Sequence, residues 1–219
     1  VFVTSPGNIS AQLSRIKAFV FDWDGVFNDG KKDISGSSPF NEVDAMGTNL
    51  LRFNNYLVHE KVPVCAVISG EKNELSFSFA RREHFNSVYF RVKHKINALQ
   101  HFCDTHRISP AEVAFFFDDV LDFSAAKVAG LRIMINRHST PLLKEYAVTN
   151  NLVDYITEFS GNEHGVRESV EMLMNASGLY TETIDQRAQY SDSYLRYLES
   201  RNNQQTSFYG TDDLVPVSV

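Results

Sequence analysis

Short runs of apolar residues alternate along the chain with longer segments whose apolar residues recur at helical spacing. Runs that are apolar at nearly every position are typical of strands in a parallel sheet whose two faces are both covered. Parallel strands need crossover connections, and a helix between consecutive strands supplies a right-handed one. The pattern therefore predicts an α/β fold of Rossmann-like type, with a mainly parallel sheet flanked by helices.

The predicted strands are Ala18–Asp22, Val62–Ile68, Ser87–Phe90, Val113–Phe117, Leu131–Ile135 and Val153–Ile156. The predicted helices are Asp44–Glu60, Glu71–His84, Lys93–Thr105, Asp119–Ala129, Pro141–Ala147 and Val166–Ala176. Residues 109–112, with the sequence SPAE, combine an N-cap serine, a proline at the first helical position and a capping-box glutamate. They predict a short helical turn before the fourth strand.

Two regions interrupt the alternation. Residues 31–41 are polar, rich in turn-forming residues and too short for a crossover, so we interpret them as a β-hairpin flap over the active face. From about Gly178 the composition turns polar, which predicts a main domain of residues 1–177 and a helical or flexible extension of residues 178–219. Within the extension, YSDSYLRYLESR predicts a short amphipathic helix with one apolar face, formed by Tyr190, Tyr194, Leu195 and Leu198.

Composition excludes several classes of protein. A formal net charge of −6 argues against a dedicated nucleic-acid binder, which usually carries a basic face. No stretch approaches the roughly 18 consecutive apolar residues of a membrane span, and the first ten residues lack the layout of a signal peptide. The chain begins with Val1 rather than methionine, which leaves an upstream segment open. Its two cysteines, Cys65 and Cys103, form no CxxC motif, so we expect a reducing, cytoplasmic compartment.

Carboxylates follow two of the predicted strands. Asp22 ends the first strand and Asp24 comes two residues later, while Asp118 and Asp119 end the fourth and Asp122 lies in the next helical turn. Ligands of parallel α/β sheets bind beyond the carboxyl ends of the strands. If the two strands are neighbours, their carboxylates converge. Two like charges about 4 Å apart repel by about 4 kcal/mol at an effective dielectric constant of 20, so the cluster needs a hard cation. An all-oxygen, partly hydrated site favours Mg²⁺. A metal site with a free carboxylate and a lysine beside it is typical of enzymes that transfer a phosphoryl group through an aspartyl-phosphate.

Each aspartate alone has an ordinary alternative as a solvated loop residue or helix cap, and Asp119 in particular is a candidate N-cap. A calcium loop is disfavoured, because Val26 and Phe27 stand where an EF-hand needs an oxygen ligand and a glycine. The joint pattern is what points to a metal site.

The motifs and their order resemble the haloacid dehalogenase superfamily, from about Ile16 to Met174. FDWDGVFNDG resembles its first motif in the long form DxDGVxxDG of the capless sugar-acid phosphatases, which act on 3-deoxy-manno-octulosonate 8-phosphate and on nonulosonate 9-phosphates. FNEVDAMG resembles the stretch after the flap, VISGEK the second motif, Lys95 in VKHKINAL the third-motif lysine and FFFDDVLD the fourth motif. GNEHGVRESV resembles the glycine-rich segment near the family's C-terminus.

The resemblance implies a role for each matched residue. Asp22 would be the nucleophile, and Asp24 the general acid and base whose backbone carbonyl also binds Mg²⁺. Asp22 and Asp118 would complete the metal ligands, with Asp119 and Asp122 in the outer shell. Ser69 would bind phosphoryl oxygens and Lys95 would neutralise nucleophile and phosphate. The residues expected to contact substrate are Ser69, Gly70, Glu71, Arg82 and Lys95.

Three of these residues keep ordinary alternatives. Ser69 is also readable as a helix N-cap, Lys95 as a solvated helix lysine, and Asp29, which would brace the loop in the family, as a turn residue. The seven histidines show no metal-ligand spacing and are mostly surface candidates: His59, His84, His94, His101, His106, His138 and His164.

The chain also departs from the family pattern. Phe117 stands where the fourth motif usually has glycine, which puts the geometry of the metal loop in question. Glu71 follows Ser69-Gly70 where the octulosonate branch usually has arginine and therefore resembles the nonulosonate branch. Phe79 takes the place of one basic residue of that branch, with Arg81 and Arg82 nearby.

The function implied is a Mg²⁺-dependent phosphomonoesterase acting on a phosphorylated acidic sugar, with no nucleic-acid or membrane partner. Relatives form tetramers in which flap and C-terminal segment reach a neighbour's active site, which implies a homotetramer. The alternative is a non-catalytic module that assists oligomerisation, as in similar domains of nucleotide-sugar synthetases. Intact Asp22, Asp24 and Lys95 oppose that alternative, whereas Phe117 and the long extension favour it mildly.

Overall fold

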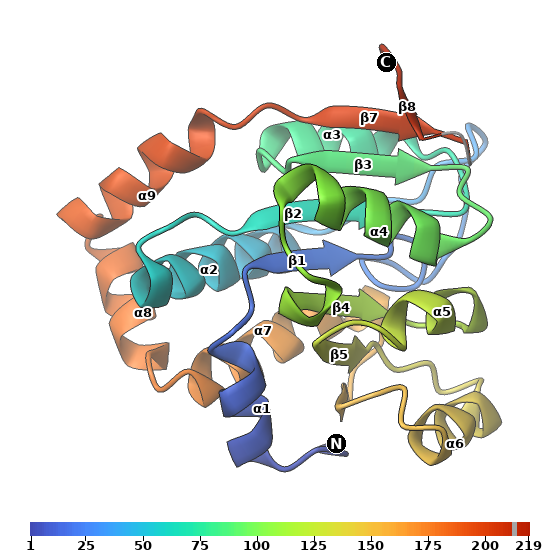
Figure 1. The fold of residues 1–219 in the computed structure, drawn as a ribbon, viewed down its shortest axis with the longest axis horizontal. Coiled ribbons are helices and arrows are strands. Elements are labelled where there is room, and N and C mark those ends of the chain that lie inside the picture. The colour runs from blue at the N-terminus through green and yellow to red at the C-terminus, as the bar shows by residue number, and fades with distance from the viewer. Residues whose placement is uncertain (212–213) are drawn as a thin grey trace.

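The computed structural model describes residues 1–211 and 214–219. Within them, one sheet has the strand order β6-β5-β4-β1-β2-β3-β7-β8, and every pair is parallel except β7 with β8 (Figure 1). The strands are β1 (Ala18–Phe21), β2 (Val64–Ile68), β3 (Ser87–Phe90), β4 (Val113–Phe117), β5 (Leu131–Met134), β6 (Tyr155–Ile156), β7 (Ser207–Gly210) and β8 (Val215–Pro216). The α/β fold expected from the alternating pattern is confirmed.

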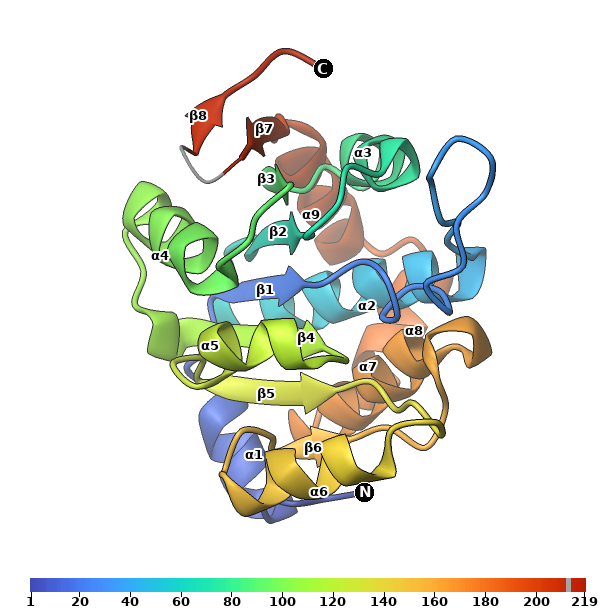
Figure 2. The same ribbon diagram turned by 90° about the vertical axis from the view of Figure 1, so that its right-hand side faces the viewer.

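Helices cover both faces of the sheet, with α4 and α5 on one side and α2, α3 and α7 on the other (Figure 2). The helices are α1 (Pro6–Leu13), α2 (Glu42–His59), α3 (Glu74–Arg82), α4 (Lys95–His106), α5 (Phe123–Ala126), α6 (Pro141–Thr149), α7 (Gly165–Ala176), α8 (Tyr180–Ala188) and α9 (Asp192–Asn202). None of these helices, within the described part of the chain, is long and apolar enough to cross a membrane.

The core has two layers because consecutive strand residues point to opposite faces. In β1, Phe19 and Phe21 join the cluster under α2 and α7, while Ala18 and Val20 join the cluster under α4 and α5. All four residues are buried. This burial on both faces is why the central strands read as continuous apolar runs.

The predicted strands and helices outside the flap are all present, with shifted ends. The helix expected from Glu71 begins at Glu74, because Asn73 is its N-cap and accepts hydrogen bonds from the N–H groups of Leu75 and Ser76. The helix expected over Asp119–Ala129 is shorter, a 3-10 turn (Val120–Asp122) followed by α5. Sequence reasoning missed α1 and α8.

The flap after β1 is a loop rather than the expected β-hairpin, and it projects beside the start of α2 (Figure 2). Its turn is closed by a hydrogen bond from the N–H of Asp33 to the carbonyl of Ser37, 2.7 Å long. The Asp33 carboxylate also accepts from the N–H groups of Ser35 and Ser37 at 2.8 and 3.0 Å. A side chain therefore takes donors that a strand ladder would use.

The C-terminal residues pack more closely onto the domain than we expected. β7 pairs in parallel with β3, so at least this strand of the extension belongs to the sheet. In α9, Tyr194 and Tyr197 are buried against Phe53, whereas Leu195 is 49% exposed. The expected apolar face was therefore wrong in choosing Leu195 over Tyr197. The division at residue 177 stays a prediction, and the pairing of β7 favours a loss of stability on truncation there.

The packing of α9 predicts a large difference between two neighbouring substitutions. Tyr197→Ala should lower the free energy of unfolding by about 3 kcal/mol, because it empties a fully buried aromatic site. Leu195→Ala, on the exposed side of the same helix, should change it by less than about 0.5 kcal/mol. Urea unfolding of both variants measures the difference. Equal, small effects would show that α9 does not pack on α2 in solution.

Candidate active site

Two neighbouring strands end in buried aspartates. β1 and β4 are parallel, with Phe21 opposite Phe116, and the N–H of Asp22 donates to the carbonyl of Phe116 at 2.9 Å. Asp22 and Asp118 therefore leave the same edge of the sheet side by side. The two strands are neighbours, as convergence of the acidic motifs requires, but three of the five expected carboxylates come together, since Asp24 and Asp119 lie outside the cluster.

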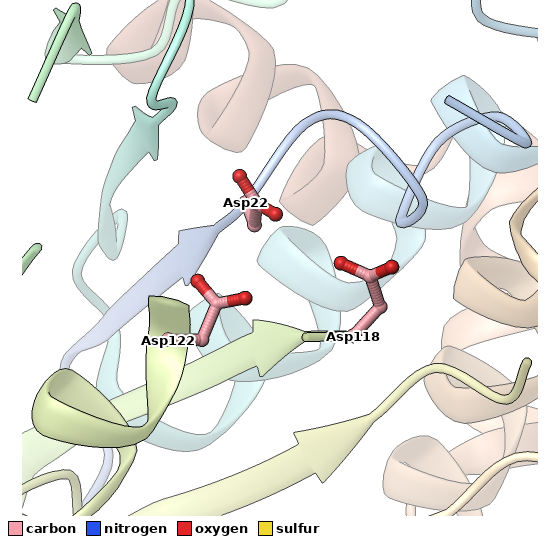
Figure 3. Close-up of side chains that lie close together, drawn as sticks. All are labelled: Asp22, Asp118 and Asp122. Carbon is pink, nitrogen blue, oxygen red and sulfur yellow. The ribbon is translucent and has the colours of Figure 1, made fainter. Parts of the chain in front are cut away.

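Asp122 completes a cluster of three carboxylates (Figure 3). It lies in the 3-10 turn after β4, is fully buried, and accepts a hydrogen bond from the N–H of Asp119. One oxygen of each of Asp22, Asp118 and Asp122 lies within 4.8 Å of the others. The three carboxylates thus come from the end of β1, the end of β4 and the turn that follows β4.

Lys95 neutralises part of this cluster. It is the first residue of α4, is 3% exposed, and its Nζ lies 2.6 Å from Oδ1 of Asp22 and 2.6 Å from Oδ1 of Asp122. Such burial excludes the alternative of a solvated helix lysine. Burial alone would lower the pKa of Lys95, but the charges of Asp22 and Asp122 raise it above its ordinary value. The ammonium therefore stays charged and holds the two carboxylates together.

The cluster still lacks positive charge. If all three carboxylates are ionised, they face two cations, Lys95 and Arg137, which leaves one net negative charge. Burial and the charge of Asp22 raise the pKa of Asp118 to about 8 and that of Asp122 to about 7. A divalent cation would favour the ionised forms of both carboxyl groups, because a bound cation lowers the pKa of the acids beside it.

Asp118 offers a free oxygen to such a cation. Its Oδ2 accepts from Nε of Arg137 at 2.5 Å, whereas its Oδ1 is buried and has no hydrogen-bond partner within the described residues. A buried acceptor left unpaired is costly. The all-carboxylate donor set fits a hard cation such as Mg²⁺.

Two glycines allow this close packing. Gly25 has φ +92°, and a Cβ there would lie 2.0 Å from Oδ2 of Asp118. Gly161, in the GNEHG segment, would place a Cβ 2.3 Å from the carbonyl oxygen of Asn28. The backbone of the loop after β1 therefore lies directly against the Asp118 side chain and against Gly161. At Gly25 and at Gly161, only glycine leaves room for this contact.

Asp24 faces the flap instead of the cluster. Its carboxylate forms an ion pair with Lys32 and accepts a hydrogen bond from the hydroxyl of Ser38, both flap residues. Ser38 is itself buried and accepts from Nδ2 of Asn73 at 2.7 Å. The flap is thus tied to Asp24 by side chains of the same chain, and a metal contact through the Asp24 carbonyl stays a prediction.

Ser69, Gly70 and Glu71 follow β2 at the same edge of the sheet. Ser69 is buried, and its Oγ accepts from the N–H of Glu71 at 3.2 Å. Ser69 is not a helix N-cap, because Asn73 has that position in α3. Glu71 is exposed, and the substrate contacts expected of these three residues stay predictions.

Three other residues have local partners. Asp29 accepts from the N–H of Lys31 at 2.9 Å, as a turn residue does. Asp119 is the N-cap of the 3-10 turn and accepts from the N–H of Val120 at 2.6 Å, so the capping alternative describes its contact. Arg82 forms ion pairs with Glu42 at 2.6 Å and Glu83 at 2.9 Å instead of contacting the carboxylate cluster.

Phe117 does not distort the metal loop. It is the last residue of β4, is buried against Phe115 and Phe123, and its φ is not among the positive values of the chain. Its carbonyl accepts from the N–H of Ile135 at 2.7 Å. The backbone here therefore needs no glycine, and the phenylalanine fills the core beside α5.

Arg137, Lys32, Ser38 and Asn73 are functional candidates that sequence reasoning missed. Arg137 follows β5, the neighbour of β4, so the rule that ligands gather beyond strand ends points to it. Lys32 and Ser38 belong to the polar stretch that we interpreted only as a flap. Nothing in the spacing indicated that they bond Asp24.

No family model matches the chain. The 3-deoxy-D-manno-octulosonate 8-phosphate phosphatase of Escherichia coli K12 is 25% identical over 183 residues, which are 82% of this chain and 90% of that protein. The homologous protein of Salmonella typhi matches over the same shares, also at 25% identity. The similarity therefore extends over nearly the whole length of these relatives.

Solved structures share the fold. The 3-deoxy-D-manno-octulosonate 8-phosphate phosphatase of Moraxella catarrhalis, solved with magnesium, phosphate and the sugar acid, has a TM-score of 0.68 at 22% identity and covers 83% of this chain and 98% of its own. A Legionella pneumophila hydrolase of haloacid dehalogenase subfamily III A also has a TM-score of 0.68, at 24% identity, covering 86% of this chain and 94% of its own. The chain is thus similar over most of its length to named sugar-acid phosphatases, and it shares the fold of a haloacid dehalogenase hydrolase, in agreement with the resemblance of its motifs.

Proposed function

We propose that the protein is a Mg²⁺-dependent phosphomonoesterase that releases phosphate from a phosphorylated acidic sugar of the octulosonate or nonulosonate type. The observation that carries the proposal is the buried Asp22 carboxylate, held by Lys95 beside the unpaired oxygen of Asp118. The proposed nucleophile lies in one cluster with a lysine ammonium and with two further carboxylates that could hold a metal ion. The named sugar-acid phosphatases similar to this chain support the substrate class.

The first step is attack on phosphorus. A carboxylate oxygen of Asp22 forms a bond to phosphorus, and the bond from phosphorus to the sugar oxygen breaks with its electron pair on that oxygen. Asp24 gives the leaving oxygen a proton. Asp22, Asp118 and the Asp24 carbonyl would hold Mg²⁺, which would supply positive charge at the phosphoryl oxygens. Lys95 adds a second positive charge at the nucleophile.

The second step regenerates the enzyme. Asp24, now a carboxylate, accepts a proton from water, whose oxygen attacks phosphorus. The bond between phosphorus and Asp22 breaks, which releases phosphate and the free carboxylate. Lys32 and Ser38 orient the Asp24 carboxylate for this proton transfer.

The remaining expected roles complete the proposal. Ser69 donates to a phosphoryl oxygen, and Asp122 positions Lys95 by the 2.6 Å contact. Asp119 lies outside the ligand set, and the sugar end of the substrate contacts Gly70, Glu71 and Arg82. We further propose a cytoplasmic homotetramer. The resemblance supports the assembly, and two buried cysteines without a disulfide fit a reducing compartment.

The proposal is tested by assaying a generic aryl phosphate with Mg²⁺, followed by a panel of phosphorylated keto acids. The proposal expects hydrolysis of the aryl phosphate and a preference for one sugar-acid phosphate. An inactive but folded protein would instead favour the non-catalytic oligomerisation module.

Metal dependence follows from the net negative charge of the cluster. Excess chelator should abolish aryl phosphate hydrolysis, and added Mg²⁺ should restore it, because the carboxylates need the cation to bind a phosphate dianion. A phosphate-release assay before and after add-back measures both. Full activity in excess chelator would refute the Mg²⁺ assignment.

Substituting the two first-motif aspartates should separate their roles. Asp22→Asn removes the nucleophilic charge and should reduce turnover to background on every substrate. Asp24→Asn should damage sugar phosphate hydrolysis by roughly 10²–10⁴, and aryl phosphate hydrolysis by much less, because an aryl oxide leaves with little protonation. Steady-state kinetics on both substrates give the comparison. Equal damage of the chemical step by Asp24→Asn would contradict the acid role.

Two adjacent flap lysines provide a matched pair. Lys32→Gln should lower kcat on the sugar phosphate by roughly tenfold, the equivalent of about 1.4 kcal/mol, because Asp24 loses a contact that orients its carboxylate for proton transfer. Lys31→Gln should leave kcat unchanged, since no ion pair joins Lys31 to Asp24 in the described residues. If both variants behave alike, the contact between Lys32 and Asp24 has no catalytic role.

A further inference from the structure

A cavity lies at the edge of the sheet opposite to Asp22. It has a volume of about 300 Å³ and is lined where β1 and β2 begin and where α2 and α4 end. In Figure 1 this is the left-hand edge, from which the strand arrows start. Its floor is apolar and consists of Val62, Pro63, Val64 and Ile108. The length of β1 separates it from the candidate active site.

The wall of the cavity is basic. Lys17, Lys61 and Arg107 line it, and no carboxylate does among the described residues. Lys17 is partly neutralised by Glu112, with Nζ and Oε1 2.5 Å apart. Lys61 and Arg107 have no ion pair in the part of the chain that the structure describes. The cavity therefore presents two unneutralised cations above an apolar floor.

Two histidines of the wall carry unused hydrogen-bonding atoms. Nε2 of His59 and Nε2 of His106 are buried and have no hydrogen-bond partner within the described residues. Burial lowers the pKa of both rings, so each is neutral near pH 7 and has one N–H to donate. Buried polar atoms are normally satisfied, and two exceptions in one cavity call for an explanation.

Helix ends account for part of this arrangement. Cations are favoured at helix C-termini, where α2 and α4 end. That preference does not explain the two unpaired nitrogens. Arg107 takes the left-handed C-cap position of α4, at φ 55°, where glycine is the usual residue.

We propose that this cavity, which we call the basal pocket, binds a small organic anion that carries a carboxylate or a phosphate group. The anionic group pairs with Arg107 and Lys61, His59 and His106 donate to its oxygens, and the carbon skeleton lies on the apolar floor. The pocket is separate from the candidate active site, so this inference stands apart from the proposed phosphatase function.

Calorimetric titration of the Mg²⁺-loaded protein tests the proposal, with malonate as the carboxylate probe and inorganic phosphate as the phosphate probe. Arg107→Gly should weaken binding by about tenfold, because it removes a charge-assisted hydrogen bond. The variant should also remain at least as stable as the native protein, since glycine suits the left-handed cap. Lys61→Gln should weaken binding by a similar factor.

Glu60→Gly is the matched control. Glu60 is the left-handed C-cap of α2, at φ 53°, so the change gives the same backbone relief but removes a negative charge. It should leave anion binding unchanged or slightly tighter. Phosphate is also the product of the proposed reaction and should therefore bind the candidate active site as well. Its inhibition of aryl phosphate hydrolysis measures binding at that site and should not change in Arg107→Gly.

Binding of malonate identifies a carboxylate site. If phosphate binds and malonate does not, and if phosphate binding is lost in Arg107→Gly, the basal pocket is a phosphate site. The proposal is overturned if neither probe binds outside the catalytic site, or if Arg107→Gly and Glu60→Gly bind equally well.

Discussion

The ion pairs of Lys95 are the contacts on which the rest of the site depends. A single ammonium, 2.6 Å from both Asp22 and Asp122, allows two carboxylates to be buried at one sheet edge. Two like charges about 4 Å apart repel by about 4 kcal/mol at an effective dielectric constant of 20, and the ammonium offsets a repulsion that favours protonation of one carboxylate. Because Lys95 is the first residue of α4, the placement of that helix on the sheet sets the position of the ammonium beside Asp22, the proposed nucleophile.

The same charge balance links the fold to the metal. Asp118 shares one oxygen with Arg137 and keeps the other free of protein partners within the described residues. The two protein cations thus leave one negative charge and one unpaired oxygen, which a hard cation would satisfy together. Gly25 lets the loop after β1 lie against the Asp118 carboxylate, so the first motif and the fourth motif are in direct contact.

The sheet and the carboxylate cluster could be predicted from sequence because both depend on local patterns. β1 and β4 are apolar on both faces, and the acids follow them directly. The structure adds that β1 and β4 are neighbours, which brings Asp22 and Asp118 together. The third-motif lysine needed the family resemblance, because a lysine at a helix start is by itself usually solvated.

The remaining features depend on tertiary contacts that leave no periodic signal. β7 is four residues long within a polar region, and only its pairing with β3 makes it a strand. The flap is a loop because Asp33 takes its backbone donors, a competition that composition does not reveal. Lys32 reaches Asp24 across eight residues of sequence, and Arg137 reaches Asp118 from the next strand end.

Trapping the covalent intermediate tests the central claim most directly. Wild-type protein mixed with aryl phosphate and Mg²⁺ and quenched in acid during turnover should yield a phosphorylated peptide, which mass spectrometry locates. The account predicts that the phosphoryl group is on Asp22 and is absent from Asp22→Asn. A phosphoryl group on another residue, or turnover by Asp22→Asn at the native rate, would contradict it.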